Sequence, residues 1–211
     1  MQDLKKIWVY RMIDIDNLAT DLTNGLYSKL NAPVDPARKE IGNTEIIRER
    51  DKREVTCHPG TVVNNYVPFY FSVRTPMLYN IYSGYGIQQI HQSKIVYLCT
   101  PLLEIATDEV VWCFTDGNAA KRITNYFTSL NDIDLIDWHS IVTTDFKHDN
   151  ADGDEDRIRK KHSEFLVKDY VPSNKIKGIV TYNDNAEILT KKIIQKAGLV
   201  IPTRVDKGYY F

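Results

Sequence analysis

Two clusters of basic side chains are the first residues in this 211-residue sequence whose types and spacing could do chemistry. The clusters consist of Arg48, Arg50, Lys52 and Arg53, and of Arg157, Arg159, Lys160 and Lys161. Arginine and lysine can bind phosphate groups, and the planar arginine side chain does so with two parallel hydrogen bonds. Runs of charge are also typical of solvated surfaces, so both interpretations stay open here. Because the net charge is −1, a nucleic-acid site would depend on such local clusters.

Aromatic and thiol side chains supply the other groups that could stack or react. The sequence contains 13 tyrosines, whose broad apolar rings suit a cleft that stacks flat ligands. Cys57 precedes His58, but neighbours in sequence lack the geometry that a catalytic Cys/His pair needs. Cys99 and Cys113 lie in apolar runs and are expected to be reduced core residues. The five histidines are scattered, and we expect no metal at any of them.

Familiar catalytic and nucleotide-binding patterns are absent from the sequence. It contains no P-loop, GxGxxG, GxSxG or HExxH pattern and no zinc-ligand spacing, so a Rossmann-type dinucleotide site is not supported. Hydrophobic residues make up 43% and charged residues 26%, which is ordinary for a globular protein. The polar start of the chain lacks the apolar stretch of a signal peptide, and no run approaches membrane-spanning length. We therefore expect a cytoplasmic protein with no membrane partner.

Short strands and helices must position these side chains. Apolar and aromatic runs predict strands at 7–12, 66–72, 95–99, 110–114, 164–167 and 178–182. Capping residues and periodicity predict helices at 17–22, 45–53, 119–130 and 187–197, and a helix that begins at Pro76 with Thr75 as its N-cap. Residues 30–60 show little periodicity, which is typical of functional or disordered segments, and 148–156 has the composition of an exposed loop. The pattern predicts one α+β domain.

Four blocks of the sequence resemble those of a known family. Residues 66–79 (YVPFYFSVRTPMLY) resemble the VPFYF and PMLY block of DarT-type DNA ADP-ribosyltransferases, and 114–120 (FTDGNAA) resemble the next block. Residues 137–138 (DW) with 157–167 (RIRKKHSEFLV) resemble the third, and 10–18 (YRMIDIDNL) match the family's opening strand and helix. The blocks occur in the family's order and span nearly the whole chain, which makes the resemblance specific.

The resemblance implies a fold and a reaction. The expected fold is that of ADP-ribosyltransferases, a split mixed or antiparallel β-sheet with flanking helices and long functional loops, formed by residues 1–211 as a single domain. The implied reaction transfers ADP-ribose from NAD+ to guanine or thymine in single-stranded DNA and releases nicotinamide. It also implies a toxin, expected to be a monomer without a metal, whose cognate antitoxin is an ADP-ribosyl-DNA glycohydrolase.

The resemblance also assigns roles to individual residues. Glu164 matches the catalytic carboxylate, which would stabilise positive charge on the ribose and help to remove a proton from the base. Arg50 matches an arginine that contacts the NAD+ phosphates and poises the acceptor base. A register shift would transfer this role to Arg48 or Arg53.

The first strand is expected to contact nicotinamide and ribose. The matching positions are Arg11, Met12 and Ile13, with Thr20 and Ser28 as further cofactor-binding candidates. The commonest family pattern in this strand is histidine, apolar, threonine, histidine, whereas this chain has Arg11 and Asp14 in place of the histidines. The difference leaves the acceptor base open between guanine and thymine, and it favours guanine slightly.

The segment from Asn118 to Glu164 matches the family's acceptor-recognition loop. The DNA contacts expected there and nearby come from Arg74, Tyr79, Asn118, Arg157, Arg159, Lys160 and Lys161. The four cations of 157–161 would hold phosphates, while Tyr70, Tyr79 and Trp138 would stack on bases. Tyr70 and Tyr79 are equally consistent with core positions, and His162 is a further candidate for the acceptor site.

Two other functions remain consistent with the sequence. The first keeps the fold but changes the acceptor to protein or RNA, and labelled NAD+ with separate DNA, RNA and protein pools distinguishes it. The second is a non-enzymatic module that binds single-stranded nucleic acid on tyrosine platforms. Such a module would bind equally well without NAD+ and would not depend on Glu164.

Overall fold

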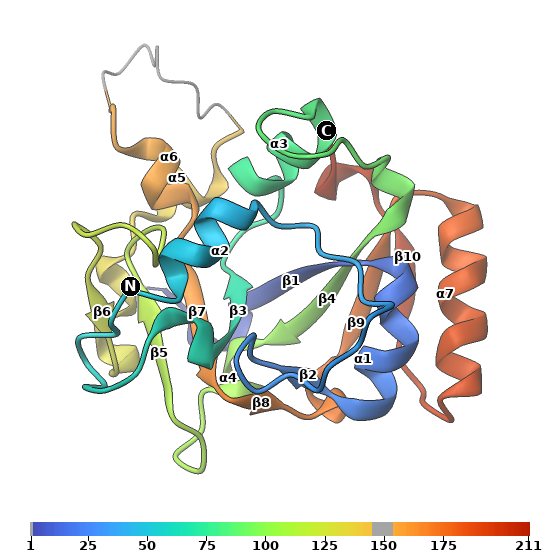
Figure 1. Cartoon of the computed structure of the whole chain (residues 1–211), viewed down its shortest axis with the longest axis horizontal. Coiled ribbons are helices and arrows are strands. Elements are labelled where there is room, and N and C mark those ends of the chain that lie inside the picture. Colours follow the sequence, from blue (N-terminus) through green and yellow to red (C-terminus); the bar gives the residue numbers. More distant parts are fainter. Residues whose placement is uncertain (1, 145–153) are drawn as a thin grey trace.

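An eight-stranded mixed sheet forms the centre of the structure, a computed structural model that describes residues 2–144 and 154–211 (Figure 1). Its strands lie in the order β10-β9-β4-β1-β3-β7-β5-β6. Their bounds are β1 (Trp8–Asp14), β3 (Tyr66–Tyr70), β4 (Ile95–Pro101), β5 (Trp112–Thr115), β6 (Tyr126–Phe127), β7 (Glu164–Lys168), β9 (Gly178–Thr181) and β10 (Thr203–Val205). Strands β9 and β10 are parallel, and the other neighbours are antiparallel. A second sheet pairs β2 (Leu26–Tyr27) with β8 (Tyr170–Val171).

The sheet is split between its two central strands. Strand β1 pairs with β4 along its whole length, whereas its pairing with β3 is confined to Tyr10 and Tyr70. Beyond this point the Arg11 side chain spans the gap, because its Nη1 donates a hydrogen bond of 3.0 Å to the carbonyl of Pro68. The split therefore leaves an opening in the middle of the sheet.

Alternation along the strands creates a core on both faces of the sheet. In β1, Val9 and Ile13 join the larger hydrophobic cluster, whereas Met12 joins the cluster on the opposite face. Helices α1 (Leu18–Asn24) and α7 (Asp184–Lys196) contact each other and contribute to the larger cluster. Helix α3 (Pro76–Ser83) packs on the other face with the C-terminal residues.

Capping side chains define the short helices near the split. The Asn43 side chain accepts hydrogen bonds from the first turn of α2 (Thr44–Arg50), and Thr75 caps α3 as predicted. The remaining α-helices of the described residues are α4 (Leu102–Ile105), α5 (Trp138–Val142) and α6 (Arg157–Lys161). Across residues 2–144 and 154–211, no helix combines the length and hydropathy that a membrane span requires.

The predicted helix over 119–130 is wrong. This segment forms turns and then β6, which pairs with β5 through Tyr126 and Phe127. Its sequence combines β-branched, aromatic and short polar residues, which have low helix propensity, so tertiary pairing decides the outcome. Of the predicted exposed loop at 148–156, residues 148–153 lie outside the described residues.

Candidate active site

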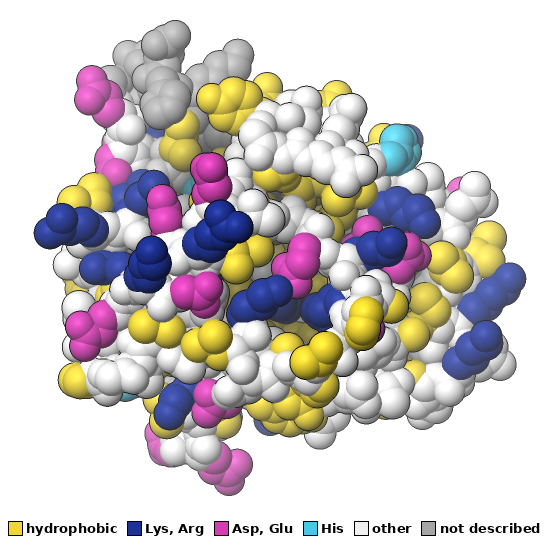
Figure 2. All heavy atoms as spheres, in the orientation of Figure 1, with side chains coloured by type: hydrophobic (Ala, Val, Ile, Leu, Met, Phe, Trp, Pro, Cys, Tyr) yellow, Lys and Arg dark blue, Asp and Glu magenta, His cyan; other side chains and the backbone are white. Residues whose placement is uncertain are grey.

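A cavity of about 550 Å³ lies at the split of the sheet. Its walls come from β1, β3 and the first residue of β7, and residues of the segment 27–50 border it on the other side. The space-filling view shows a hollow near the centre of this face, with basic and acidic side chains around it (Figure 2). A volume of this size falls within the range of roughly 300–1,000 Å³ that is usual for ligand pockets.

Glu164 and Arg50 form an ion pair in the wall of this cavity. Nη1 of Arg50 donates a hydrogen bond of 3.0 Å to Oε1 of Glu164, and Nη2 lies 3.0 Å from Oε2. The two side chains are 11% and 2% exposed, respectively. The backbone N–H of Ala119 donates a third contact, 3.1 Å long, to Oε1. The carboxylate is therefore fixed by three contacts from two separate segments.

The start of β7 is itself anchored to the neighbouring strand. The backbone N–H of Glu164 donates to Oγ1 of Thr115 over 3.0 Å, and this hydroxyl donates to the carbonyl of Gly117 over 2.6 Å. Thr115 ends β5 and is fully buried. The position of the carboxylate thus depends on the strand ends as well as on Arg50.

The pKa values of Arg11 and Arg50 are shifted in opposite directions. Burial alone would lower the pKa of Arg50, but the adjacent Glu164 carboxylate more than offsets this and raises the pKa. Arg11 lacks such an adjacent carboxylate within the described part of the chain, and burial lowers the pKa of its guanidinium. Among the described residues, Nε of Arg11 has no hydrogen-bond partner. This guanidinium therefore retains a donor that a ligand could use.

The cavity contains most of the residues predicted to bind NAD+. Those that line it are Arg11, Met12, Ile13 and Arg50, together with the predicted catalytic residue Glu164 and the predicted DNA contact Asn118, whereas Arg48 and Arg53 do not line it. Thr20 and Ser28 do not line it, so the cavity gives their predicted cofactor-binding role no support. Thr20 lies on the half-buried side of α1, and Ser28 is buried beside Asp169, whose carbonyl accepts its backbone N–H.

The basic run at 157–161 is engaged within the protein, which gives its prediction as a phosphate-binding segment no support. Arg159 contacts the carboxylates of Asp116 and Asp156 at 2.9 and 2.7 Å. Lys160 contacts two further aspartates, Asp137 and Asp154. Arg157 and Lys161 are buried, and Lys161 donates to the backbone carbonyls of Ile141 and Thr143. These contacts therefore direct the cations toward groups of the protein itself.

The predicted stacking residues differ in their surroundings. Trp138 packs against Phe71 with ring centroids 5.7 Å apart, so it is part of the core. Tyr70 lines the cavity, and its hydroxyl donates to Sδ of Met77. Tyr79 lies outside the cavity, 43% exposed, with its ring 5.3 Å from that of Phe211. Stacking by Tyr79 stays a prediction.

Arg74 faces the C-terminus of the chain. Its Nε donates to the carbonyl of Tyr210, and its guanidinium lies 6.0 Å from the centre of the Phe211 ring. Arg74 also has a φ of 50°, which is uncommon for a residue with a side chain. The geometry therefore indicates that Arg74 positions the C-terminal residues, and a direct DNA contact is not supported.

His162 lies in the cavity wall with one ring nitrogen available. Its Nδ1 is 3.0 Å from the carbonyl of Ile158, and because a carbonyl only accepts, this nitrogen carries the proton. Burial lowers the pKa of the imidazole, so the ring is neutral near pH 7. The other nitrogen, Nε2, is then a hydrogen-bond acceptor.

The sequence did not single out three further cations of the cavity wall, at positions 29, 38 and 39. Lys29, Arg38 and Lys39 all line the cavity. Arg38 pairs with Asp21 at 2.7 Å, and Lys29 pairs with Glu40 at the same distance. The only signal in the sequence was the lack of periodicity in residues 30–60. That signal indicated a functional segment but did not identify individual residues.

Comparisons with known proteins identify the family of this chain. The sequence model of the family described as "ssDNA thymidine ADP-ribosyltransferase, DarT" matches residues 10–211. A DNA ADP-ribosyl transferase of Escherichia coli O127:H6 is 32% identical over 208 residues, which cover 98% of this chain and 94% of that protein.

Two solved structures are similar over nearly the whole chain. Thermus sp. 2.9 DarT in complex with ADP-ribosylated ssDNA superposes with a TM-score of 0.88 and 28% identity, covering 97% of this chain and 96% of that one. The same protein in complex with NAD+ gives a TM-score of 0.84 and 27% identity, covering 97% and 98%. These matches confirm the predicted α+β ADP-ribosyltransferase fold, and the chain belongs to the DarT family of ADP-ribosyltransferases that act on single-stranded DNA.

Proposed function

We propose that this chain cleaves NAD+ and transfers the ADP-ribose to a base of single-stranded DNA through the Glu164–Arg50 pair. The observation that carries this proposal is a buried carboxylate, fixed by an arginine and a backbone N–H, in the wall of a cavity of about 550 Å³. An acidic side chain held in this way is suited to stabilise a cation that forms during a reaction.

The reaction follows from the charges in the cavity. The bond between the nicotinamide nitrogen and ribose C1′ breaks, its electron pair leaves with nicotinamide, and positive charge develops on the ribose. The Glu164 carboxylate stabilises this charge, and a base nitrogen then forms the new bond to C1′. The proton lost by that nitrogen passes to Glu164, a contribution of roughly 10²–10⁴-fold in rate.

The remaining cavity residues bind and orient NAD+. Arg11 offers a donor on Nε, and its charge together with Lys29 and Lys39 is complementary to the two phosphates of the dinucleotide. Met12 and Ile13 supply apolar wall beside these charges. Fixing both partners in one site removes much of the entropy cost of bringing them together.

The acceptor is guanine or thymine, and His162 is placed to orient it. Both bases carry a ring N–H, and Nε2 of His162 is an acceptor in the cavity wall beside Tyr70, whose ring lies 6.1 Å from the imidazole. Stacking on Tyr70 would hold either base next to Glu164. A hydrogen bond to Nε2 suits guanine, which has more than one N–H, whereas the single N–H of thymine is the one that gives its proton to Glu164. The presence of Arg11 and Asp14 where the commonest family pattern has histidines favours guanine.

An exposed basic surface replaces 157–161 as the proposed DNA path. It consists of Arg48, Lys52, Lys121 and Arg122, which are all exposed and extend from α2 to the turn after Asn118. Lys and Arg side chains gather on this side of the molecule in the space-filling view (Figure 2). The surface adjoins the cavity through Asn118 and Arg50, so phosphates bound there would place a neighbouring base near Glu164.

Mass spectrometry of nucleosides tests the reaction and identifies the acceptor. Oligonucleotides that contain a single guanine or a single thymine are incubated with the enzyme and NAD+, alongside RNA and protein pools. We expect a mass increase of one ADP-ribose on one DNA nucleoside and release of nicotinamide. Labelling confined to RNA or protein would contradict the proposal and support the corresponding alternative acceptor.

The cellular role rests on the family. We place the reaction in the cytoplasm, where NAD+ and DNA meet, and the three free cysteines are consistent with a reducing compartment. An ADP-ribosyl-DNA glycohydrolase as antitoxin would reverse the modification. Co-expression of such a glycohydrolase should restore growth of cells that produce this chain, and failure to do so would contradict the pairing.

A further inference from the structure

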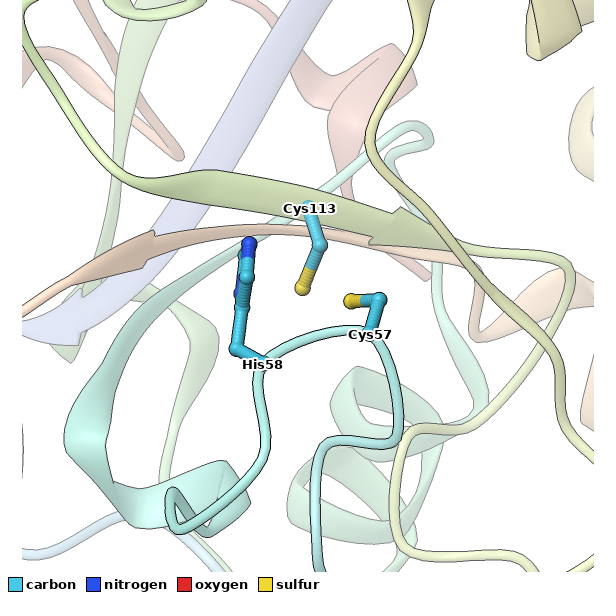
Figure 3. Close-up of side chains that lie close together, drawn as sticks. All are labelled: Cys57, His58 and Cys113. Carbon is cyan, nitrogen blue, oxygen red and sulfur yellow. The ribbon is translucent and has the colours of Figure 1, made fainter.

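Three potential metal ligands converge outside the cavity. One ligand atom from each of Cys57, His58 and Cys113 lies within 4.8 Å of the others, the only such group of metal-binding side chains found among the described residues. Figure 3 shows the two sulfur atoms directed toward each other, with the imidazole of His58 alongside. Cys57 and His58 belong to the loop after α2, whereas Cys113 lies on β5. The cluster thus connects two segments that are distant in sequence.

The loop that carries two of these ligands is tightly folded. Glu54 and Val62 form an isolated β-bridge that closes it. Inside the loop, the N–H of His58 donates to the carbonyl of Val55 over 2.8 Å, and the N–H of Thr61 donates to the carbonyl of His58 over 3.2 Å. These bonds fix the direction of the two ligand side chains before any metal binds, which lowers the entropy cost of binding.

A chain of hydrogen bonds determines the tautomer of the neutral His58 ring. The Thr61 hydroxyl donates its proton to the carbonyl of His58 over 2.7 Å, so in its 3.0 Å contact with Tyr66 it is the acceptor. The Tyr66 hydroxyl therefore uses its proton on Thr61 and accepts from Nδ1 of His58 over 2.9 Å. Nδ1 carries the proton, and Nε2 is left with its lone pair for a metal. Metal-binding histidines commonly have such a partner on the other nitrogen.

We infer that Cys57, His58 and Cys113 bind a zinc ion. Two thiolates and one imidazole are the donor set that tetrahedral Zn²⁺ prefers, and three protein ligands leave one position for water. The surroundings support binding, because Cys113 is fully buried within a hydrophobic cluster that includes Val55, Val63 and Leu166. A metal in this position would neutralise two thiolates that would otherwise be costly to bury.

The zinc ion would fasten the loop after α2 to the sheet. Arg50 is the last residue of α2, and Cys57 follows seven positions later, while β5 pairs with the strand that begins at Glu164. Asn64 strengthens the same connection, since its Nδ2 donates to the carbonyl of Ile47 and to Oδ1 of Asp51. The site therefore holds the helix that positions Arg50, and it is separate from the reacting atoms.

Metal analysis of the purified chain tests the inference directly. We expect one zinc ion per chain by elemental analysis, and titration with Co²⁺ should give the charge-transfer absorption of thiolate ligands. Cys57→Ser, in a half-buried loop, should weaken zinc binding by more than about 100-fold, while Tyr66→Phe should weaken it about 10- to 100-fold. Cys99→Ser is the matched control, because Cys99 is also a free cysteine but lies outside the cluster.

Stability provides a second measurement that does not depend on activity. A chelator should lower the melting temperature of the parent and of Cys99→Ser, but not that of Cys57→Ser. The inference is overturned if the parent binds no zinc, or if Cys57→Ser binds it as tightly as the parent. A Cys57–Cys113 disulfide in the freshly isolated protein would also overturn it, because both thiolates would be consumed. Zinc binding is expected equally in an inactive Glu164→Gln variant, so this result is independent of the proposed function.

Discussion

Replacing Arg50 by lysine tests how far the arginine side chain positions the Glu164 carboxylate. Nη1 of Arg50 donates to Oε1 over 3.0 Å, and Nη2 lies 3.0 Å from Oε2. A lysine ammonium keeps the charge but cannot contact both oxygens with the same planar geometry. The variant therefore lacks one charge-assisted hydrogen bond and the orientation that it provides, while the N–H of Ala119 still contacts Oε1.

The expected loss of kcat/KM in Arg50→Lys follows from the burial of the Arg50–Glu164 pair. Both side chains are nearly enclosed, at 11% and 2% exposed, so solvent screens their interaction only weakly. A hydrogen bond to a charged group contributes about 1.5–3 kcal/mol, and about 1.4 kcal/mol corresponds to a tenfold change in rate. If this hydrogen bond is needed in the transition state, kcat/KM for Arg50→Lys falls about 10- to 150-fold.

The assay is the single-turnover appearance of ADP-ribosylated oligonucleotide at several NAD+ concentrations, resolved by gel electrophoresis. Arg204→Lys is the matched control, since Arg204 is exposed on β10 and does not line the cavity. Thermal melts confirm that both variants are folded. A parent-like kcat/KM for Arg50→Lys would refute the positioning role, and so would an equal loss in Arg204→Lys.

Three other perturbations address the surface, a buried charge and the core. Arg122→Glu should weaken oligonucleotide binding, measured by fluorescence anisotropy. The slope of log affinity against log salt concentration should become shallower by about 0.7 for each phosphate that is no longer bound. Lys192→Glu on α7 should change neither quantity, and equal effects of the two substitutions would contradict the proposed DNA path. Burial lowers the pKa of Lys161 from 10.5 to about 8, so between these values the unfolded state binds more protons and stability rises with pH. Urea unfolding between about pH 8 and 9.5 should show this rise, up to about 1.4 kcal/mol per pH unit, and Lys161→Met should lack it; an identical slope in both proteins would contradict the lowered pKa. Phe165→Ala, at a fully buried position, should cost about 3–5 kcal/mol in denaturant unfolding, and half-exposed Ile188→Ala far less; similar losses would contradict the assigned core.

Local patterns in the sequence were sufficient for most strands and for the capped helices. The apolar run at 95–99 forms β4, and consecutive residues such as Tyr97 and Leu98 are buried on opposite faces of the sheet. Thr75 and Pro76 start α3 as predicted, since capping depends on neighbouring residues alone. The helix expected at 119–130 failed because pairing of Tyr126 with β5 is a tertiary effect.

The candidate site could be predicted only in part, because its contacts join distant segments. Arg50 and Glu164 are 114 positions apart, and no local pattern shows that they meet. The family resemblance identified both residues as candidates for the site. The ion pairs made by residues 157–161 could not be predicted for the same reason. Arg159 is neutralised partly by Asp116, which lies 43 positions away, so a run that looks free in the sequence is paired in the fold.

The sequence also could not show which cysteines lie close together in the fold. Cys99 and Cys113 are buried and unpaired, as their apolar surroundings predicted. The proximity of Cys113 to Cys57 and His58 arises from the fold of the loop after α2 against β5, which sequence spacing does not reveal. Zinc-ligand patterns in sequence rely on regular spacing within one segment, whereas this cluster combines a neighbouring pair with a ligand from a remote strand.

The most direct test of the proposed catalysis is the rate of nucleoside modification by Glu164→Gln. Glutamine keeps the shape of the side chain and one oxygen for Arg50 and Ala119, but it removes the negative charge that would stabilise the ribose cation and accept the proton. Isothermal titration should show that the variant still binds NAD+, while mass spectrometry should show formation of the ADP-ribosylated nucleoside slowed by roughly 10²–10⁴-fold. Product formation at the parent's rate would contradict the catalytic role of this carboxylate.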